Sequence, residues 1–215
     1  GDSINLSDLQ QNDPEALATL DKDLESKTGL DLNTDENGNL SYTTEKGFLG
    51  IKKAKVARDS NGKKIGSRSA RKALKSAIKD KETINVFDSD GSGNRVTPGT
   101  NNLYFDIGQI NDLMDKASSD LDPTTMGPAL IFLHEAGHTL VGGSRSDGRK
   151  SKRDVRPGPN PKRINRMRRQ LGISFGIRAA YDPTSVGTDS YMPFSKKTLK
   201  RIKKGKVPNE KYLKF

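Results

Sequence analysis

Apolar residues recur every three or four positions between residues 126 and 141, near the middle of the chain. This spacing places them on one face of a helix and predicts that the helix is mostly buried. Asp122-Pro123 is expected to open the helix, and Gly142-Gly143 to end it. The apolar positions of this helix are Met126, Ala129, Leu130, Leu133, Ala136, Leu140 and Val141.

Shorter amphipathic helices are predicted on both sides of this central helix. Residues 2–27 form one N-terminal helix or two, since Asp13-Pro14-Glu15 is a favourable helix start and Leu17, Leu20 and Leu24 give an apolar stripe. The remaining helices are predicted at residues 67–79, at residues 108–119, and from Pro161 or Lys162 to Leu171.

Two short runs rich in β-branched and aromatic residues predict strands, at residues 84–87 and 102–106. With the helices they predict an α+β fold in which the central helix packs on a small, twisted, mainly antiparallel sheet. The second run comes shortly before the central helix. We expect it to be an edge strand, along which an extended chain can add to the sheet.

Two acidic, glycine-containing segments, residues 33–39 and 88–94, are predicted to be turns. Asn33, Asp35 and Asn37 alternate before Gly38, as they would in a calcium loop. The twelfth position counted from Asn33 is a threonine, however, where the EF-hand pattern requires a glutamate. We therefore favour an Asn-Gly hairpin for the first segment and an exposed loop for the second.

The 215 residues are enough for one domain with a core of its own. We expect a single domain over residues 1–215, with residues 1–27 as an N-terminal helical extension and residues 195–215 as a basic C-terminal tail. Apolar residues make up 31% of the chain and charged residues 30%, which predicts a modest core and long polar loops. The chain has no cysteine, so disulfides and thiolate zinc ligands are excluded.

The net charge of +11 lies mostly in the C-terminal third of the chain. Nucleic acid is the usual partner of such an excess of positive charge, but we favour a solvated basic face that attracts acidic protein substrates or anionic surfaces. No apolar run reaches membrane-spanning length, and we expect no transmembrane segment and no signal-peptide core.

Both histidines of the chain lie on the central helix, in the HExxH sequence that His134, Glu135 and His138 form. Positions i and i+4 lie one turn apart on one helix face, so the two imidazoles can bind one Zn²⁺ ion. Glu135 is then placed to act as a base on water. Gly137 disfavours a helix but is expected to leave room beside the metal. The confinement of histidine to this motif favours a metal site over a chance match.

A catalytic zinc site needs a third protein ligand, and without further His or Cys it must be an acid. Asp147 is the first candidate, because it lies nine residues after His138, just past a glycine turn. Asp154 is the alternative, followed by Asp189 and Glu210.

Arg178 and Tyr181 form a second pair of candidate catalytic residues. A hydrolase that attacks a carbonyl must stabilise an oxyanion, and a guanidinium and a phenol are suitable donors. The alternative is a surface arginine beside a core tyrosine.

Three parts of the chain resemble a known group of proteins. They are residues 27–32 with their continuation at residues 35–42, the HExxH helix, and residues 165–173 followed by Arg178-Ala-Ala-Tyr181. Together they resemble the NleD-like effector metallopeptidases and related toxin domains of secreted bacterial proteins. Clostridial neurotoxin light chains show a similar combination of HExxH and a downstream RxxY.

The resemblance implies a zincin-like fold and a zinc metalloendopeptidase, secreted as an effector or toxin and delivered into a host or competitor cell. It implies transition-state roles for Arg178 and Tyr181 and a protein or peptide substrate of the target cell. Secretion machinery or a cognate immunity protein are the other partners that it suggests. The alternative is a basic, non-catalytic binding protein with a structural or vestigial zinc site, and an intact Glu135 favours the enzyme.

Overall fold

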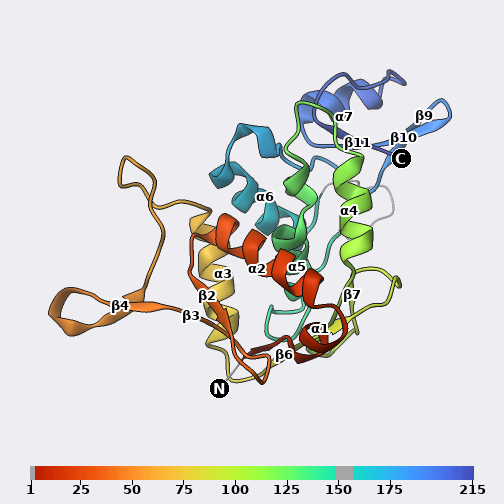
Figure 1. Ribbon diagram of the computed structural model, residues 1–215. Coiled ribbons are helices and arrows are strands. Elements are labelled where there is room, and N and C mark those ends of the chain that lie inside the picture. Colours follow the sequence, from red (N-terminus) through yellow and green to blue (C-terminus); the bar gives the residue numbers. More distant parts are fainter. Residues whose placement is uncertain (1–2, 149–156) are drawn as a thin grey trace.

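The helix α5 (Pro128–Ala136) lies at the centre of the computed structural model, which describes residues 3–148 and 157–215. All its residues except Glu135 are buried. The long helix α2 (Pro14–Thr28) packs against it, and the Asp23 carboxylate accepts a hydrogen bond from the Ala129 amide at 2.9 Å. This bond satisfies one of the free amides at the positive end of α5. The N-terminal segment is therefore part of the core that supports the central helix (Figure 1).

The central helix is shorter at both ends than the apolar pattern predicted. Residues 123–126 form a separate 3₁₀ turn, η2 (Pro123–Met126), because Gly127 is extended and Pro128 opens a new helix. At the other end, the helix stops six residues before the predicted end, and Leu140 is 49% exposed. The Thr139 hydroxyl donates a hydrogen bond to the Ala136 carbonyl at 2.7 Å, and this side-chain bond replaces the next backbone bond of the helix.

Four strands form the largest sheet, in the order β1 (Ile4–Asn5), β6 (Ile84–Asp88), β8 (Asn102–Phe105) and β7 (Arg95–Val96). The two predicted strands are confirmed as β6 and β8. The prediction that this sheet is mainly antiparallel is wrong, since β1 and β8 both run parallel to β6 and only β7 is antiparallel to its neighbour. The connection from β6 to β8 contains β7. It is long enough for the chain to return to the end of the sheet where β6 begins, so β8 can run parallel to β6.

The prediction that residues 102–106 form an edge strand is wrong, because β8 lies inside the sheet. It pairs with β6 on one side and with β7 on the other, so on this side of the sheet β7, and not β8, is the edge strand. The overall class is α+β, as predicted.

The other predicted helices are confirmed with small shifts at their ends. Ser67 caps α3 through its side chain, and Asp106 caps α4 in the same way. The N-terminal segment contains two helices rather than one. The bounds of these helices are α1 (Ser7–Asn12), α3 (Arg68–Ile78), α4 (Ile107–Asp115) and α6 (Pro159–Leu171).

Two hairpins follow α2, and the first is the predicted Asn-Gly hairpin. In the first, the Asp35 carboxylate accepts the amides of Asn37 and Asn39, and Gly38 has a positive φ of 80° that suits the tight turn. The second hairpin extends away from the body of the molecule (Figure 1). These elements are β2 (Leu32–Thr34), β3 (Leu40–Tyr42), β4 (Thr44–Lys46), η1 (Phe48–Gly50) and β5 (Lys52–Ala54).

The C-terminal segment forms a second, antiparallel sheet in the order β11-β10-β9. Residues 195–215 contribute a helix and a strand to this region, and Leu213 is fully buried in the core. The bounds are η3 (Ile173–Phe175), β9 (Thr184–Val186), β10 (Asp189–Pro193), α7 (Lys196–Ile202) and β11 (Tyr212–Lys214). Among the described residues, none of the helices has the length and apolar run needed to span a bilayer.

Candidate metal centre

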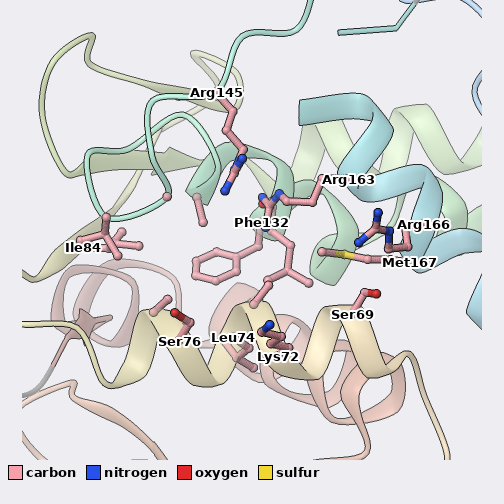
Figure 2. Close-up of a pocket in the computed structure, with 16 residues that line it drawn as sticks. Ser69, Lys72, Leu74, Ser76, Ile84, Phe132, Arg145, Arg163, Arg166 and Met167 are labelled. Atoms are coloured by element: carbon pink, nitrogen blue, oxygen red, sulfur yellow. The ribbon is translucent and has the colours of Figure 1, made fainter. Parts of the chain in front are cut away.

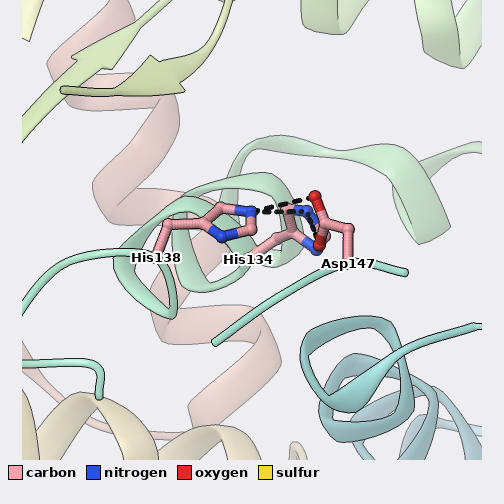
Figure 3. A group of neighbouring side chains, drawn as sticks. All are labelled: His134, His138 and Asp147. Atoms are coloured by element: carbon pink, nitrogen blue, oxygen red, sulfur yellow. Dashed lines mark hydrogen bonds and ion pairs between the residues drawn. The ribbon is translucent and has the colours of Figure 1, made fainter. Parts of the chain in front are cut away.

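The two histidines of the HExxH motif face one point at the end of α5 (Figure 3). His134 lies on the helix, and His138 follows its last residue by two positions. The amides of Gly137 and His138 bond to carbonyls three residues back, so the chain continues for one tighter, 3₁₀-like turn. This turn keeps the imidazoles together, with 3.4 Å between their Nε2 atoms.

The Asp147 carboxylate completes the group. One of its oxygens lies 3.1 Å from Nε2 of His134, and the other lies 3.1 Å from Nε2 of His138. One potential ligand atom from each of these three side chains lies within 4.8 Å of the other two. The structure thus brings together the two histidines and the first candidate for the third ligand.

Asp147 reaches the histidines because its loop is fixed to the start of α6. The Asp147 carbonyl accepts the Gly158 amide at 2.6 Å, and the Ser146 carbonyl accepts the Asn160 amide at 3.0 Å. A Cβ at Gly158 would lie 2.6 Å from the Asp147 carbonyl, so only glycine allows this approach.

The donor set fits a metal ion. The carbonyl of Arg145 lies 2.7 Å from Nδ1 of His138 and can only accept, so His138 donates from Nδ1. In the neutral imidazole, Nε2 then carries a lone pair that faces the Asp147 carboxylate, an arrangement that a cation between them stabilises. Two ligands held at about 2.0–2.1 Å from one tetrahedral zinc ion would lie about 3.3 Å apart, close to the observed separations.

The electrostatics of the three side chains agree with this arrangement. Burial alone would raise the pKa of Asp147, but, without a metal ion, hydrogen bonds from both histidines and from Tyr181 hold that pKa well below its usual range. Burial lowers the pKa of His134, which favours the neutral imidazole that metals bind. The bond to Asp147 raises the pKa of His138.

Glu135 lies beside the group and lines the same cleft. Burial raises the pKa of its carboxyl to about 7, against the opposing charge of His138. A carboxyl with such a pKa exchanges protons readily at neutral pH.

Tyr181 also lies at the centre, but Arg178 does not line it. The Tyr181 hydroxyl donates to Asp147 Oδ2 at 2.7 Å, and burial together with this bond raises the pKa of the phenol. The Arg178 guanidinium instead lies 4.5 Å from the centre of the Tyr181 ring and donates to the Tyr181 carbonyl. Arg178 therefore positions the tyrosine and does not itself face the cleft.

The cleft at the centre has a volume of about 460 Å³. One wall is formed by Tyr181 and the loop after α5, and the other by the β7 edge strand and the turn that follows it, residues 97–99. An extended chain lying along β7 would thus pass beside Glu135 and the metal-binding side chains.

The other candidate acids lie elsewhere. Asp154 falls outside the described residues. Asp189, on β10, pairs with Lys214 at 3.0 Å, and Glu210 pairs with Lys197 at 3.1 Å. Among the acids that the structure describes, only Asp147 joins the histidines.

Asn160, which no sequence pattern indicated, is fully buried beside the centre. Its Nδ2 donates to the His134 carbonyl at 2.8 Å and lies 3.4 Å from Asp147 Oδ1. A side chain at Gly137 would clash with it, so Gly137 leaves room for Asn160 rather than for the metal. The flanking prolines mark a helix start, but nothing in the local sequence distinguishes this asparagine from a loop residue.

Comparison of the chain with protein-family models, with curated proteins and with solved structures finds no match.

Proposed function

We propose that the protein is a zinc-dependent endopeptidase of the HExxH type, with a zincin-like active site. The observation that carries the proposal is the group of His134, His138 and Asp147 with Glu135 in the same cleft. A purely structural zinc site would have four protein ligands and no need of a base. Here two of the three candidate ligands, His138 and Asp147, line an open cleft together with Glu135, which suits a hydrolytic site.

Each side chain has a role in peptide hydrolysis. A zinc ion held by His134, His138 and Asp147 would polarise the scissile carbonyl and make a water molecule more acidic. Glu135 takes the proton of the attacking water and passes it to the leaving amine. Tyr181 stays protonated because its pKa is raised, so its hydroxyl can turn from Asp147 and donate to the developing oxyanion.

The substrate is proposed to be a protein of a target cell. The β7 edge strand offers backbone groups to an extended peptide beside Glu135, which suits cleavage within a chain. Secretion as a bacterial effector or toxin, and the partners that accompany delivery, rest on the resemblance of the motifs to the NleD-like metallopeptidases.

The second candidate function is a basic, non-catalytic binding protein with a vestigial zinc site. The net charge of +11 favours it. The position of Glu135 in the cleft favours the enzyme.

A combined metal and protease assay distinguishes the two. The enzyme is expected to contain one zinc per chain and to cleave an unfolded protein such as casein, and a chelator should abolish the cleavage. Restoration by added Zn²⁺ would support the proposal. One zinc per chain without cleavage of any substrate in a broad peptide panel would favour the binding protein.

A further inference from the structure

A cavity of about 330 Å³ lies behind α5, between that helix, α3 and α6 (Figure 2). Its apolar floor includes Leu74, Phe132 and Met167. It is separate from the metal cleft, and the two share only Arg145.

Four cationic side chains from three different segments line this cavity. Lys72 comes from α3, Arg163 and Arg166 come from α6, and Arg145 comes from the loop after α5. Figure 2 shows the guanidinium groups of Arg145 and Arg163 near one another above Phe132. No acidic side chain lines the cavity among the residues that the structure describes.

Arg163 is the residue that distinguishes this cluster from an ordinary basic surface. Burial, with the nearby charge of Arg145, lowers the pKa of Arg163 to about 10. Its guanidinium donates to the Leu133 carbonyl and lies 3.4 Å from Asn160 Oδ1, but its buried Nε has no hydrogen-bond partner within the described chain. It has no ion-pair partner there either.

A buried cation without a counter-ion is costly, whereas solvated lysines and arginines on a basic face need no partner. An anion with several oxygens would remove this cost, because it can accept from the buried guanidinium and from mobile cations at the rim at the same time. Lys72, Arg145 and Arg166 are such rim cations. The hydroxyls of Ser69 and Ser76 on α3 also line the cavity and can add neutral donors.

We propose that this cavity is a binding site for a phosphate group, carried either by a small soluble molecule or by a lipid headgroup. A phosphate offers the tetrahedral set of acceptors that converging arginines bind best. The apolar floor would contact whatever the phosphate is attached to. The site shares Arg145 with the metal cleft, but its proposal does not rest on peptidase activity.

Isothermal titration calorimetry with pyrophosphate tests the site. The protein is first freed of metal with a chelator, because pyrophosphate could otherwise bind at the metal centre. We expect one pyrophosphate per chain. Arg145→Gln and Lys72→Gln should each weaken binding about tenfold, the usual effect of losing one charge-assisted contact. Both residues are exposed, so these variants are expected to fold.

Lys75→Gln is the matched control, since Lys75 lies on the same helix but does not line the cavity. Its binding of pyrophosphate should equal that of the parent. Equal losses in Lys75→Gln and Arg145→Gln would overturn the proposal and indicate general attraction to a basic face.

A second arm identifies the source of the phosphate. Vesicles of phosphatidylcholine doped with phosphatidic acid are sedimented with the protein. Vesicle binding that is lost in Arg145→Gln, without binding of pyrophosphate, would assign the site to a lipid headgroup. Binding of pyrophosphate alone would assign it to a soluble ligand, and binding of neither probe would refute the site.

Discussion

Tyr181 connects the metal-binding side chains to the segment that follows α6. Its hydroxyl donates to Asp147, and its ring packs against Arg178. Asn165 in turn holds Arg178 in place, because its side chain bonds both the amide and the carbonyl of that residue at 2.9 Å. The proposed oxyanion donor, Tyr181, can therefore be tested separately from the residues that position it.

Tyr181→Phe is expected to keep zinc and fold but to lower kcat about 10²- to 10³-fold, since one donor to the oxyanion is lost. Zinc content and steady-state kinetics on a cleavable peptide measure the two effects. Tyr191→Phe is the control, because that hydroxyl bonds Asp189 outside the cleft. An unchanged kcat in Tyr181→Phe would mean that another residue donates to the oxyanion.

Asp147→Ala should weaken zinc binding by more than about 100-fold, the upper end of the loss caused by residues that only support a ligand. Competition with a chromophoric chelator measures the affinity. Asp189→Ala, which removes an acid that pairs with Lys214, should bind zinc as the parent does. A larger loss in Asp154→Ala than in Asp147→Ala would transfer the third ligand to Asp154.

At the scale of elements, the metal centre depends on how α5 meets α6. The Gly137 carbonyl accepts the Arg145 amide at 2.8 Å, which turns the chain back after His138. Asn160, at the start of α6, fills the space that Gly137 leaves. The two helices and the loop between them therefore form one unit around the centre.

Gly137→Ala tests this contact. The added methyl group would clash with Asn160, and we expect a loss of about 1–3 kcal/mol in the free energy of unfolding together with weaker zinc binding. Chemical denaturation and zinc titration measure both. Gly148→Ala, in the same loop but with open space around it, should change neither. If the two variants behave alike, the close packing of Gly137 on Asn160 has no energetic role.

Most elements were predictable from the sequence because they depend on local spacing. The apolar periodicity of α2, α3 and α6 and the Asn-Gly turn at Gly38 each have a cause within a few residues. The HExxH motif also lies within a few residues. Because the third zinc ligand had to be an acid, Asp147 was its first candidate.

The features that could not be predicted from the sequence depend mainly on contacts between distant segments. The direction of β8 is set by pairing with β6, and the early end of α5 by Thr139 and by packing on α6. Asn160 and Arg163 acquire their positions only when α6 meets α5. No local pattern carries such information.

At the scale of the whole molecule, stability should depend on pH through Asp21 on α2. Burial raises the pKa of this carboxyl from 3.8 to about 6, and Oδ1 has no hydrogen-bond partner among the described residues. Between these two pKa values the unfolded chain releases its proton while the folded chain keeps it. Stability is therefore greatest below the lower value and falls as the pH rises towards the higher one.

Asp21→Asn removes this dependence. It should raise the free energy of unfolding by about 1 kcal/mol near pH 8, after allowance for solvent screening, and should change it little near pH 4. Urea denaturation at the two pH values measures the difference. A variant that is destabilised equally at both would contradict the account of the buried carboxyl.

The molecule as a whole is proposed to be a zinc peptidase with Glu135 as its base. The most direct test of this claim is digestion of a peptide library derived from a cell proteome, with new termini identified by mass spectrometry. Parent protein loaded with zinc should generate new termini, and Glu135→Gln, with the same zinc content, should generate almost none. Equal cleavage by both proteins, or no cleavage by the zinc-loaded parent, would contradict the claim.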